Sequence, residues 1–190
     1  MEVFTALSET VETGMQRVSF DVISTLHSQL STLEQDFTER ILNMRAVVTR
    51  VKSASVEIDG AVQAAIGKGF LVLLGVHVDD TEAEAKRIAD KICGLRVFED
   101  EAGKMNVNPL DAGAELLIVS QFTLYADCKS RRPGFTRAAR PETAIPLYEL
   151  VVQECRGRGF TVGTGVFGAE MQVYSQNDGP VTIILDTEKL

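Results

Sequence analysis

The sequence has few of the side chains that hold metals or build disulfide frameworks. Its three cysteines, Cys93, Cys128 and Cys155, are odd in number, widely separated and without a CxxC spacing. The two histidines, His27 and His77, stand in no spacing that suggests metal ligation. These absences argue against a disulfide scaffold and a zinc site. We therefore expect reduced thiols and a chemistry that needs no metal and no cofactor.

Long hydrophobic runs are also missing. No stretch approaches the roughly 20 apolar residues of a membrane-spanning helix, and the N-terminus lacks the apolar run of a signal peptide. The 190 residues are 45% hydrophobic and 24% charged, which is ordinary for a soluble protein with one sizeable core. We expect a cytoplasmic protein whose partners include neither a membrane nor DNA.

The net charge of -8 at first argues against any nucleic-acid partner, because phosphate binding normally needs a basic surface. The distribution of the charge weakens that objection. Residues 1–43 hold seven acids and two bases, whereas residues 44–190 hold twenty acids and seventeen bases. Most of the excess acid therefore lies in the first 43 residues.

Residues 1–43 carry apolar side chains at steps of three or four from Phe4 to Ile41. This stripe is typical of an amphipathic helix, with a weak point at Gly14. From Met44 the apolar period changes from 3.6 to 2. The sequence therefore predicts a helical N-terminal extension over residues 1–43 and a separate domain over residues 44–190.

The domain alternates strand and helix patterns. Residues 44–52 and 54–58 are expected to form two strands, and Asp59-Gly60 a tight turn that pairs residues 61–66 back. Further strands are predicted at residues 70–78, 95–99, 104–107, 116–119, 161–166, 170–176 and 181–187. One helix begins with the capping box of Thr81 and Glu84 and ends at a left-handed Gly94. A second begins regularly at about Ile145, because two prolines cannot share its first turn. The class is mixed α/β with largely antiparallel pairing and two body helices.

The stretch from Leu116 to Asp127, LLIVSQFTLYAD, stands out as a candidate site. Its apolar start reads as a buried strand, which delivers Ser120, Gln121 and Thr123 at its end. Hydroxyl groups at such a position either serve a site or merely begin a turn by bonding nearby backbone. The residues of this stretch leave both interpretations open.

A second motif, NDGPVT at residues 177–182, is a turn cluster followed by a strand that begins at Pro180. Together, SQFT and NDGPVT make residues 44–190 resemble the D-aminoacyl-tRNA deacylases, which remove D-amino acids from tRNA as proofreading enzymes. The runs MRAVVTRVKSASV, GKGFLVLLGV and GVFGAEMQVYSQNDGPVT extend the resemblance. It implies a barrel-like sheet, an obligate homodimer, and hydrolysis of D-aminoacyl-tRNA and glycyl-tRNA.

For such a hydrolysis, backbone amides near Phe122 and Thr123 could stabilise the oxyanion. Thr123 has a hydroxyl but no evident base beside it, so it would be a poor nucleophile. The resemblance implies instead that the 2′-hydroxyl of the terminal adenosine assists, with Ser120 and Gln121 orienting the ester. A related deacylase for another mischarged tRNA, or a tRNA-end binding module without turnover, are the alternatives.

Stereochemistry demands a rigid barrier, because a pocket that only fits side chains discriminates by about 1–3 kcal/mol. The resemblance implies that Gly179-Pro180 forms a cis pair that enters the active site of the other subunit, braced by Arg50. From the residues alone, the pair reads as a trans turn and Arg50 equally as an exposed ion-pair partner.

Two further groups are candidates for holding the tRNA end. Phe135, Phe167 and Met171 could contact the terminal adenine, although the pattern favours core residues. The acid-free run after the SQFT stretch includes Lys129, Arg131 and Arg132, which could neutralise phosphates or simply form a solvated loop.

Overall fold

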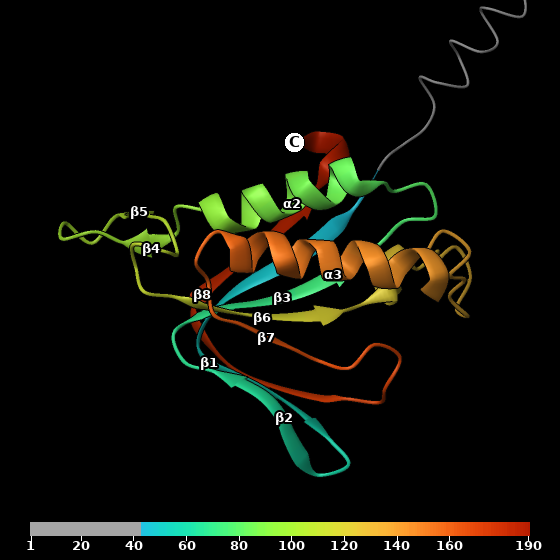
Figure 1. Ribbon diagram of the computed structural model, residues 1–190, viewed down its shortest axis with the longest axis horizontal. Helices are drawn as coiled ribbons and strands as arrows, with labels where there is room; N and C mark the ends of the chain where they lie inside the picture. The colour runs from blue at the N-terminus through green and yellow to red at the C-terminus, as the bar shows by residue number, and fades with distance from the viewer. Residues whose placement is uncertain (1–42) are drawn as a thin grey trace, which may run out of the picture. The chain divides into compact units, whose positions relative to one another are not determined.

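The computed structural model describes residues 43–190, so the helix expected in the N-terminal extension lies outside the described residues. The described chain forms eight strands and two α-helices (Figure 1). The strands are β1 (Arg45–Ile58), β2 (Ala61–Ile66), β3 (Gly69–Gly75), β4 (Phe98–Glu99), β5 (Met105–Val107), β6 (Glu115–Ser120), β7 (Val162–Thr164) and β8 (Gln172–Asp186). The helices are α2 (Glu82–Gly94) and α3 (Pro141–Gly157), with the short 3-10 helices η1 (Phe122–Tyr125) and η2 (Thr187–Lys189).

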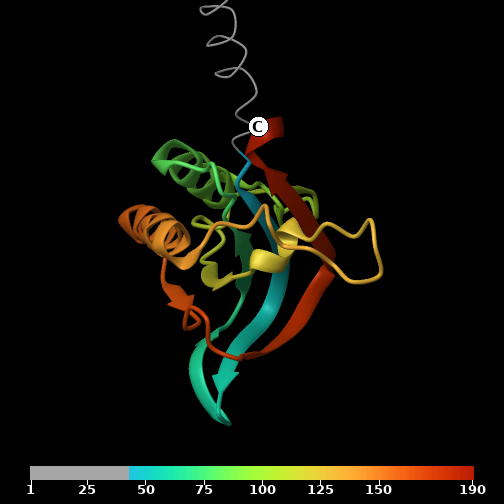
Figure 2. The same cartoon turned by 90° about the vertical axis from the view of Figure 1, so that its right-hand side faces the viewer.

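Six strands form one sheet in the order β2-β1-β3-β6-β7, and β8 pairs with β1 along its other edge. The pairs that include β1 are antiparallel, whereas β3, β6 and β7 run parallel. β2 also lies against β6 and β7, so the sheet curls toward closure. The mixed, barrel-like sheet expected from the sequence is therefore confirmed, and Figure 2 shows how the long strands β1 and β8 curve together.

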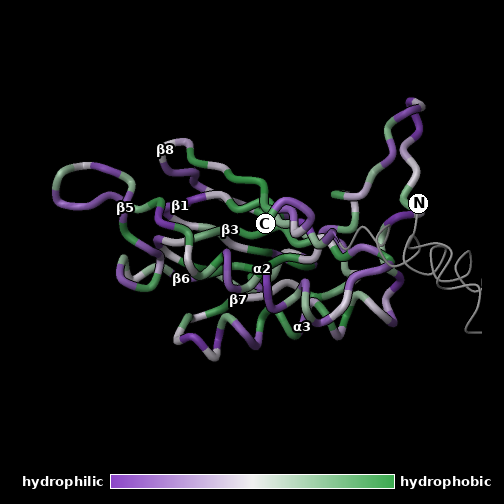
Figure 3. The backbone as a smooth tube through the Cα atoms, turned by 90° about the horizontal axis from the view of Figure 1, so that it is seen from above, coloured by the Kyte–Doolittle hydropathy of each residue, from purple (hydrophilic) through white to green (hydrophobic). Residues whose placement is uncertain are grey.

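The central strands β3 and β6 are covered on both faces. Phe70, Val72 and Leu74 of β3 join the core beneath α2 and α3, while Leu71 joins a smaller cluster on the opposite face. β6 divides its side chains in the same way. This double coverage explains why both strands are almost continuously apolar. Many of the hydrophilic residues lie in the projecting loops (Figure 3).

Several boundaries differ from the sequence predictions. The two strands expected over residues 44–52 and 54–58 are one strand, β1 (Arg45–Ile58), because one of its edges pairs with β3 and then β2 while the other pairs with β8. The strand expected over residues 70–78 ends at Gly75. Gly94 is the last residue of α2 and has no positive φ, so the expected left-handed stop is wrong.

The start of α3 also differs. The helix begins at Pro141, which is its first residue, and continues through Pro146 instead of starting at Ile145. Pro146 removes only the hydrogen bond to the carbonyl of Glu142, and both residues are exposed, so water can replace that bond. The prediction failed because it treated the two prolines as competitors for one turn.

Candidate active site

The SQFT motif lies where β6 leaves the sheet. The amide of Gln121 still donates to the carbonyl of Leu74 at 2.7 Å, after which the chain turns into η1. This turn crosses close to the end of β3, where a Cβ on Gly75 would lie 3.0 Å from the ring of Tyr125 and 3.1 Å from the carbonyl oxygen of Gln121. Glycine at position 75 therefore makes room for the turn.

The turn presents polar groups to solvent. Phe122 and Thr123 are exposed, and the Gln121 side chain donates to Thr123 Oγ1 at 2.5 Å. That is the only hydrogen bond of the Thr123 hydroxyl within residues 43–190, and no acid or base contacts it there. The Gln121 side chain does not accept a hydrogen bond from the first amides of η1. Among the described residues, the amides of Phe122 and Thr123 have no acceptor, so both can bind a ligand.

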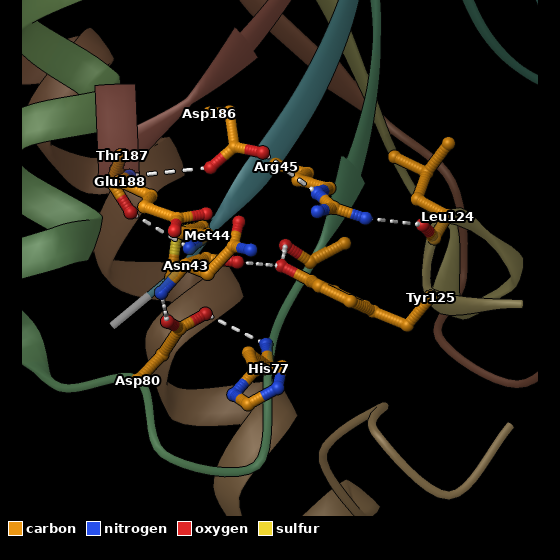
Figure 4. A network of polar contacts seen from close by, with 11 residues as sticks. Asn43, Met44, Arg45, His77, Asp80, Leu124, Tyr125, Asp186, Thr187 and Glu188 are labelled. Atoms are coloured by element: carbon orange, nitrogen blue, oxygen red, sulfur yellow. Dashed lines mark hydrogen bonds and ion pairs between the residues drawn. The ribbon is translucent and has the colours of Figure 1, made fainter. Parts of the chain in front are cut away.

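A buried polar network anchors the other end of η1 (Figure 4). The hydroxyl of Tyr125 donates to the carbonyl of Asn43 and, at 3.4 Å, to that of Gly75. Arg45 donates to the carbonyl of Leu124 at 3.4 Å and lies over the Tyr125 ring, 5.3 Å from its centroid. The first strand of the sheet therefore positions the turn that carries Thr123.

The same network contains perturbed titratable groups. Burial raises the pKa of Asp80 to about 6, although amide donation from His77 (2.7 Å) and Asn43 (2.9 Å) partly offsets this. Burial also lowers the pKa of His77 and raises that of Tyr125. None of these groups faces the Thr123 hydroxyl, so their role is to support the turn.

A basic loop follows the turn. Its two sides meet at a bridge between Asp127 and Gly134, and Lys129, Arg131 and Arg132 are exposed along it. Lys129 pairs loosely with Asp127 at 3.8 Å. Arg131 and Arg132 take part in no ion pair within the described region. The loop therefore presents positive charge directly after η1.

Aromatic groups also gather at this edge of the sheet. Phe122 and Phe135 form an edge-to-face pair with ring centroids 5.1 Å apart, and they are 54% and 37% exposed. Phe135 is therefore a surface residue. Phe167 follows the end of β7, which is parallel to β6, so it lies at the same edge as Ser120. It packs on Tyr148 and lines a cavity of about 290 Å³ with Arg156.

Met171 is half-buried and lies farther inside. It packs against the smaller core cluster, and its sulfur would lie 2.5 Å from a Cβ on Gly165. Phe167 and Met171 therefore pack partly against the core, as expected if they are core residues. Phe167 also borders the cavity described above.

The NDGPVT motif forms no separate turn between two strands, in contrast to the sequence prediction. Its residues belong to the continuous strand β8. Between the pairs Thr49–Thr182 and Val51–Asn177, β1 advances two residues and β8 five, so residues 178–181 bulge opposite Arg50. Gly179-Pro180 is a cis pair and is exposed on this bulge.

Arg50 holds the base of the bulge. Its guanidinium is buried and donates to the carbonyl of Val97 at 2.5 Å and to the carbonyl of Asp178 at 3.4 Å. Its Nε also lies 3.1 Å from the Asp178 carboxylate. A Cβ on Gly179 would lie 3.2 Å from Arg50 Nη2. Arg50 is therefore an ion-pair partner, as one interpretation had it, but it is buried and not exposed.

The structure does not bring the two motifs together within one chain. Ser120 lies opposite Leu74, which lies opposite Ala46 on β1, and the bulge faces Arg50 four residues farther on. At about 3.3 Å per residue and about 4.8 Å between strands, the bulge is displaced by ~13 Å along the strands and ~14 Å across the sheet. The SQFT turn, the basic loop and Phe167 share one edge, and Gly179-Pro180 does not.

Sequence reasoning missed three supporting residues, namely Gly75, Tyr125 and Arg45. Gly75 carried a signal, since a glycine that ends an apolar strand often marks a close backbone approach. Tyr125 and Arg45 carried none, because their partners are backbone carbonyls that become neighbours only in the folded sheet.

Comparison with known proteins identifies the family. The model of the family described as D-Tyr-tRNA(Tyr) deacylase matches residues 47–186. Proteins named D-aminoacyl-tRNA deacylase are similar throughout this region. The one from Clostridioides difficile (strain 630) is 56% identical over 147 residues, which cover 77% of this chain and 99% of the relative. The one from Roseiflexus castenholzii is 57% identical over 145 residues, covering 76% and 92%.

Two solved structures share the fold. A structure described as c-Myc DNA Unwinding Element Binding Protein has a TM-score of 0.71 at 45% identity, covering 74% of this chain and 97% of its own. A probable eukaryotic D-amino acid tRNA deacylase has a TM-score of 0.67 at 15% identity, covering 76% and 99%, and shows the likeness of fold alone. The protein belongs to the D-Tyr-tRNA(Tyr) deacylase family.

Proposed function

We propose that this protein hydrolyses the ester bond of D-aminoacyl-tRNA and releases free D-amino acid and tRNA, a chiral proofreading step in translation. The observation that carries this function is the family match over residues 47–186, together with relatives of more than 55% identity that are named for this activity. Glycyl-tRNA is a second substrate, because a pocket that excludes L side chains does not exclude a missing one. The place of action is the cytoplasm, where such a step in translation occurs.

The SQFT turn supplies the chemistry in this proposal. The free amides of Phe122 and Thr123 are suited to bind the oxyanion that develops as the ester is attacked. Thr123 lacks a base to activate its hydroxyl, so attack by water assisted by the 2′-hydroxyl of the substrate ribose is favoured. The side chains of Ser120 and Gln121 orient the ribose and the carbonyl.

The neighbouring groups receive the 3′ end of the tRNA. Phosphates adjoin Lys129, Arg131 and Arg132, which are exposed on the loop directly after the turn. The terminal adenine lies near the exposed Phe122–Phe135 pair or the cavity beside Phe167, since aromatic faces stack on bases. Met171 lies against Gly165, which lines that cavity, and is the third candidate for a contact with the adenine.

Chiral selection comes from a second subunit. The bulge that carries Gly179-Pro180 projects from β8, far from the SQFT turn of its own chain. β8 is an edge strand with Val173, Tyr174 and Ile184 exposed, at 40%, 49% and 73% of their surface. Long exposed edge strands are ready to pair with another chain. A homodimer that covers β8 would carry each bulge to the SQFT turn of its partner.

The test is deacylation of matched D- and L-tyrosyl-tRNA by the purified protein, with and without a chelator. The expected result is rapid cleavage of the D-substrate, at least a hundredfold slower cleavage of the L-substrate, and no effect of the chelator. Equal cleavage of both enantiomers would indicate a deacylase without chiral proofreading. Binding of tRNA without turnover would leave only a tRNA-end binding module.

A further inference from the structure

Two thiols that the proposed reaction does not use meet at one end of the helical layer. Cys93 lies in the last turn of α2, and Cys155 in the last turn of α3. The two helices pack side by side and end at the same side of the molecule (Figure 1). Both side chains belong to the same buried core cluster, and neither is part of a disulfide.

The position of the pair is fixed by an independent contact. Asp90, one turn before Cys93, accepts a hydrogen bond from Arg158, which lies one turn after Cys155, at 2.6 Å. This ion pair joins the two helix ends directly beside the thiols. Because this contact holds the two packed helix ends together, a disulfide between Cys93 and Cys155 would need no separation of the helices.

The two cysteines differ in access to solvent. Cys155 is completely buried, whereas Cys93 keeps 9% of its surface and borders a cavity of about 360 Å³ that Arg158 also lines. A small oxidant can therefore reach Cys93 from the cavity and cannot reach Cys155 directly.

The surroundings also differ in their effect on ionisation. The hydrogen bond from the Cys155 thiol and the charge of Arg158 lower the pKa of Cys93, against opposing effects of burial, Asp90 and Glu154. The same hydrogen bond and burial raise the pKa of Cys155. A cysteine with a lowered pKa beside one with a raised pKa is the arrangement of redox-sensing pairs.

We propose that Cys93 and Cys155 form a redox pair, in which a hydroperoxide oxidises Cys93 and Cys155 then closes a disulfide between α2 and α3. In the first step the Cys93 thiolate attacks the peroxide oxygen, the O–O bond breaks, and the products are a sulfenic acid and, after protonation, an alcohol or water. In the second step the Cys155 sulfur displaces the sulfenic hydroxyl, which leaves as water with the Cys155 proton. Two electrons pass from the two thiols to the peroxide.

The proposed disulfide would lie close in sequence to the contact through which Arg50 supports the bulge of β8. Val97 follows Cys93 by four residues, and its carbonyl accepts the 2.5 Å hydrogen bond from Arg50. The cross-link would therefore fix the end of α2, and the segment that follows the helix makes this contact.

The test treats the full-length native protein with hydrogen peroxide, quenches it, and maps disulfides by peptide mass spectrometry. A Cys128→Ser background removes the exposed third thiol, which would otherwise form links between molecules. The expected product is one Cys93–Cys155 cross-linked peptide, lighter than the reduced pair by two hydrogen atoms, with loss of both titratable thiols. The same cross-linked peptide is expected from the wild-type chain, so this outcome does not depend on a variant.

Two variants in that background test the order of steps. Cys155→Ser is expected to accumulate a Cys93 sulfenic acid that dimedone traps, because no resolving thiol remains. Cys93→Ser is expected to leave Cys155 reduced at least tenfold longer. The proposal would be overturned if Cys93 and Cys155 stayed reduced after a peroxide exposure that fully oxidises Cys128 of the wild-type chain. A cross-link that forms only in denaturant would also overturn it.

Discussion

Thr123 is the residue whose role in the reaction is most open to experiment. Its hydroxyl receives a hydrogen bond from Gln121 and contacts no acid or base within residues 43–190. If the substrate hydroxyl assists water, Thr123→Ala keeps the backbone amides and lowers the rate only about tenfold. Single-turnover hydrolysis of D-tyrosyl-tRNA measures this. A fall to the uncatalysed rate in a folded variant, or an acyl ester trapped on Thr123, would instead identify it as the nucleophile.

Asp80 is the residue that gives the domain a distinctive dependence on pH. Its folded pKa is raised to about 6 from an ordinary value of 3.8, so the folded state binds more protons than the unfolded state between these values. Its contribution to the free energy of unfolding is therefore largest below about pH 4 and is lost as the pH rises through 6. The full effect is about 2 kcal/mol after allowance for partial exposure.

Urea unfolding of wild type and Asp80→Asn at pH 5.0 and 7.5 measures this contribution. The variant loses one acceptor for the amides of His77 and Asn43 at every pH. The titration of Asp80 is therefore reported only by how the difference in unfolding free energy between wild type and variant changes with pH. The free energy of unfolding of wild type, relative to that of the variant, should be about 1 kcal/mol higher at pH 5.0 than at pH 7.5. Asp59→Asn, in the exposed turn, is the control, and an equal gain there would contradict the assignment.

At the scale of elements, the end of β3 and the turn η1 depend on each other. A Cβ at position 75 would press on Tyr125 and on the Gln121 carbonyl at 3.0 and 3.1 Å. Gly75→Ala should therefore displace η1 by a few tenths of an ångström. We expect it to lower kcat for D-tyrosyl-tRNA about tenfold or more and stability by about 1–3 kcal/mol.

Gly94→Ala is the matched control for this change. Gly94 ends α2, is exposed and has nothing within 4 Å of the added methyl group. Alanine there should leave kcat unchanged and stabilise the helix by up to about 1 kcal/mol. Wild-type kinetics for Gly75→Ala in the same assay would show that η1 tolerates the crowding and that this contact does not position the site.

The elements that the sequence predicted well are those whose signals are local. The Asp59-Gly60 turn forms with both residues at positive φ, and Thr81 and Glu84 form the capping box that their spacing indicates. The apolar runs of β3 and β6 are buried strands, because period and burial agree there.

The features that the sequence could not predict depend on distant partners. β8 is one strand through Gly179-Pro180 because β1 runs beside it on both sides of the bulge. For the same reason, the polar partners of Arg50 could not be read from its strand. The resemblance to the family indicated the importance of these residues but not their hydrogen bonds.

At the scale of the whole molecule, residues 43–190 should be sufficient for activity, because Asn43 is the first residue of the network that anchors η1. The relative from Clostridioides difficile aligns over 147 residues with 99% of its own length, and every site residue lies after Met44. A chain that starts at Asn43 after an initiating methionine keeps the contacts of Asn43 to Tyr125 and Asp80, and it should cleave D-tyrosyl-tRNA within twofold of the full-length rate. A loss of more than tenfold, with the oligomeric state unchanged, would make the first 42 residues part of the catalytic unit.

The proposed dimer predicts that chiral selection acts between subunits. Gly179 has a φ of +119°, and a Cβ there would lie 2.8 Å from Val181 and 3.2 Å from Arg50, so Gly179→Ala should distort the bulge. The free amides near Phe122 stay intact in this variant. It should therefore cleave L-tyrosyl-tRNA at least tenfold faster than wild type while retaining most of its D-activity.

Pairing with an inactive chain should restore selectivity to the Gly179→Ala chain, which is called the leaky chain below. Phe122→Pro removes one amide of the η1 turn and leaves the bulge unchanged, so its homodimers should cleave neither substrate. In a mixed dimer, the intact SQFT turn of the leaky chain meets the intact bulge of the Phe122→Pro chain, whereas the other site contains both defects.

Co-expression with a tenfold excess of the Phe122→Pro chain tests this arrangement, because about nine in ten leaky chains then have an inactive partner under random pairing. Cleavage of L-tyrosyl-tRNA per leaky chain should fall about tenfold, while D-cleavage per leaky chain persists. Size-exclusion chromatography of differently tagged chains verifies that mixed dimers form. If L-cleavage per leaky chain stays unchanged in verified mixed dimers, the bulge acts on its own chain, and selection across the dimer is wrong.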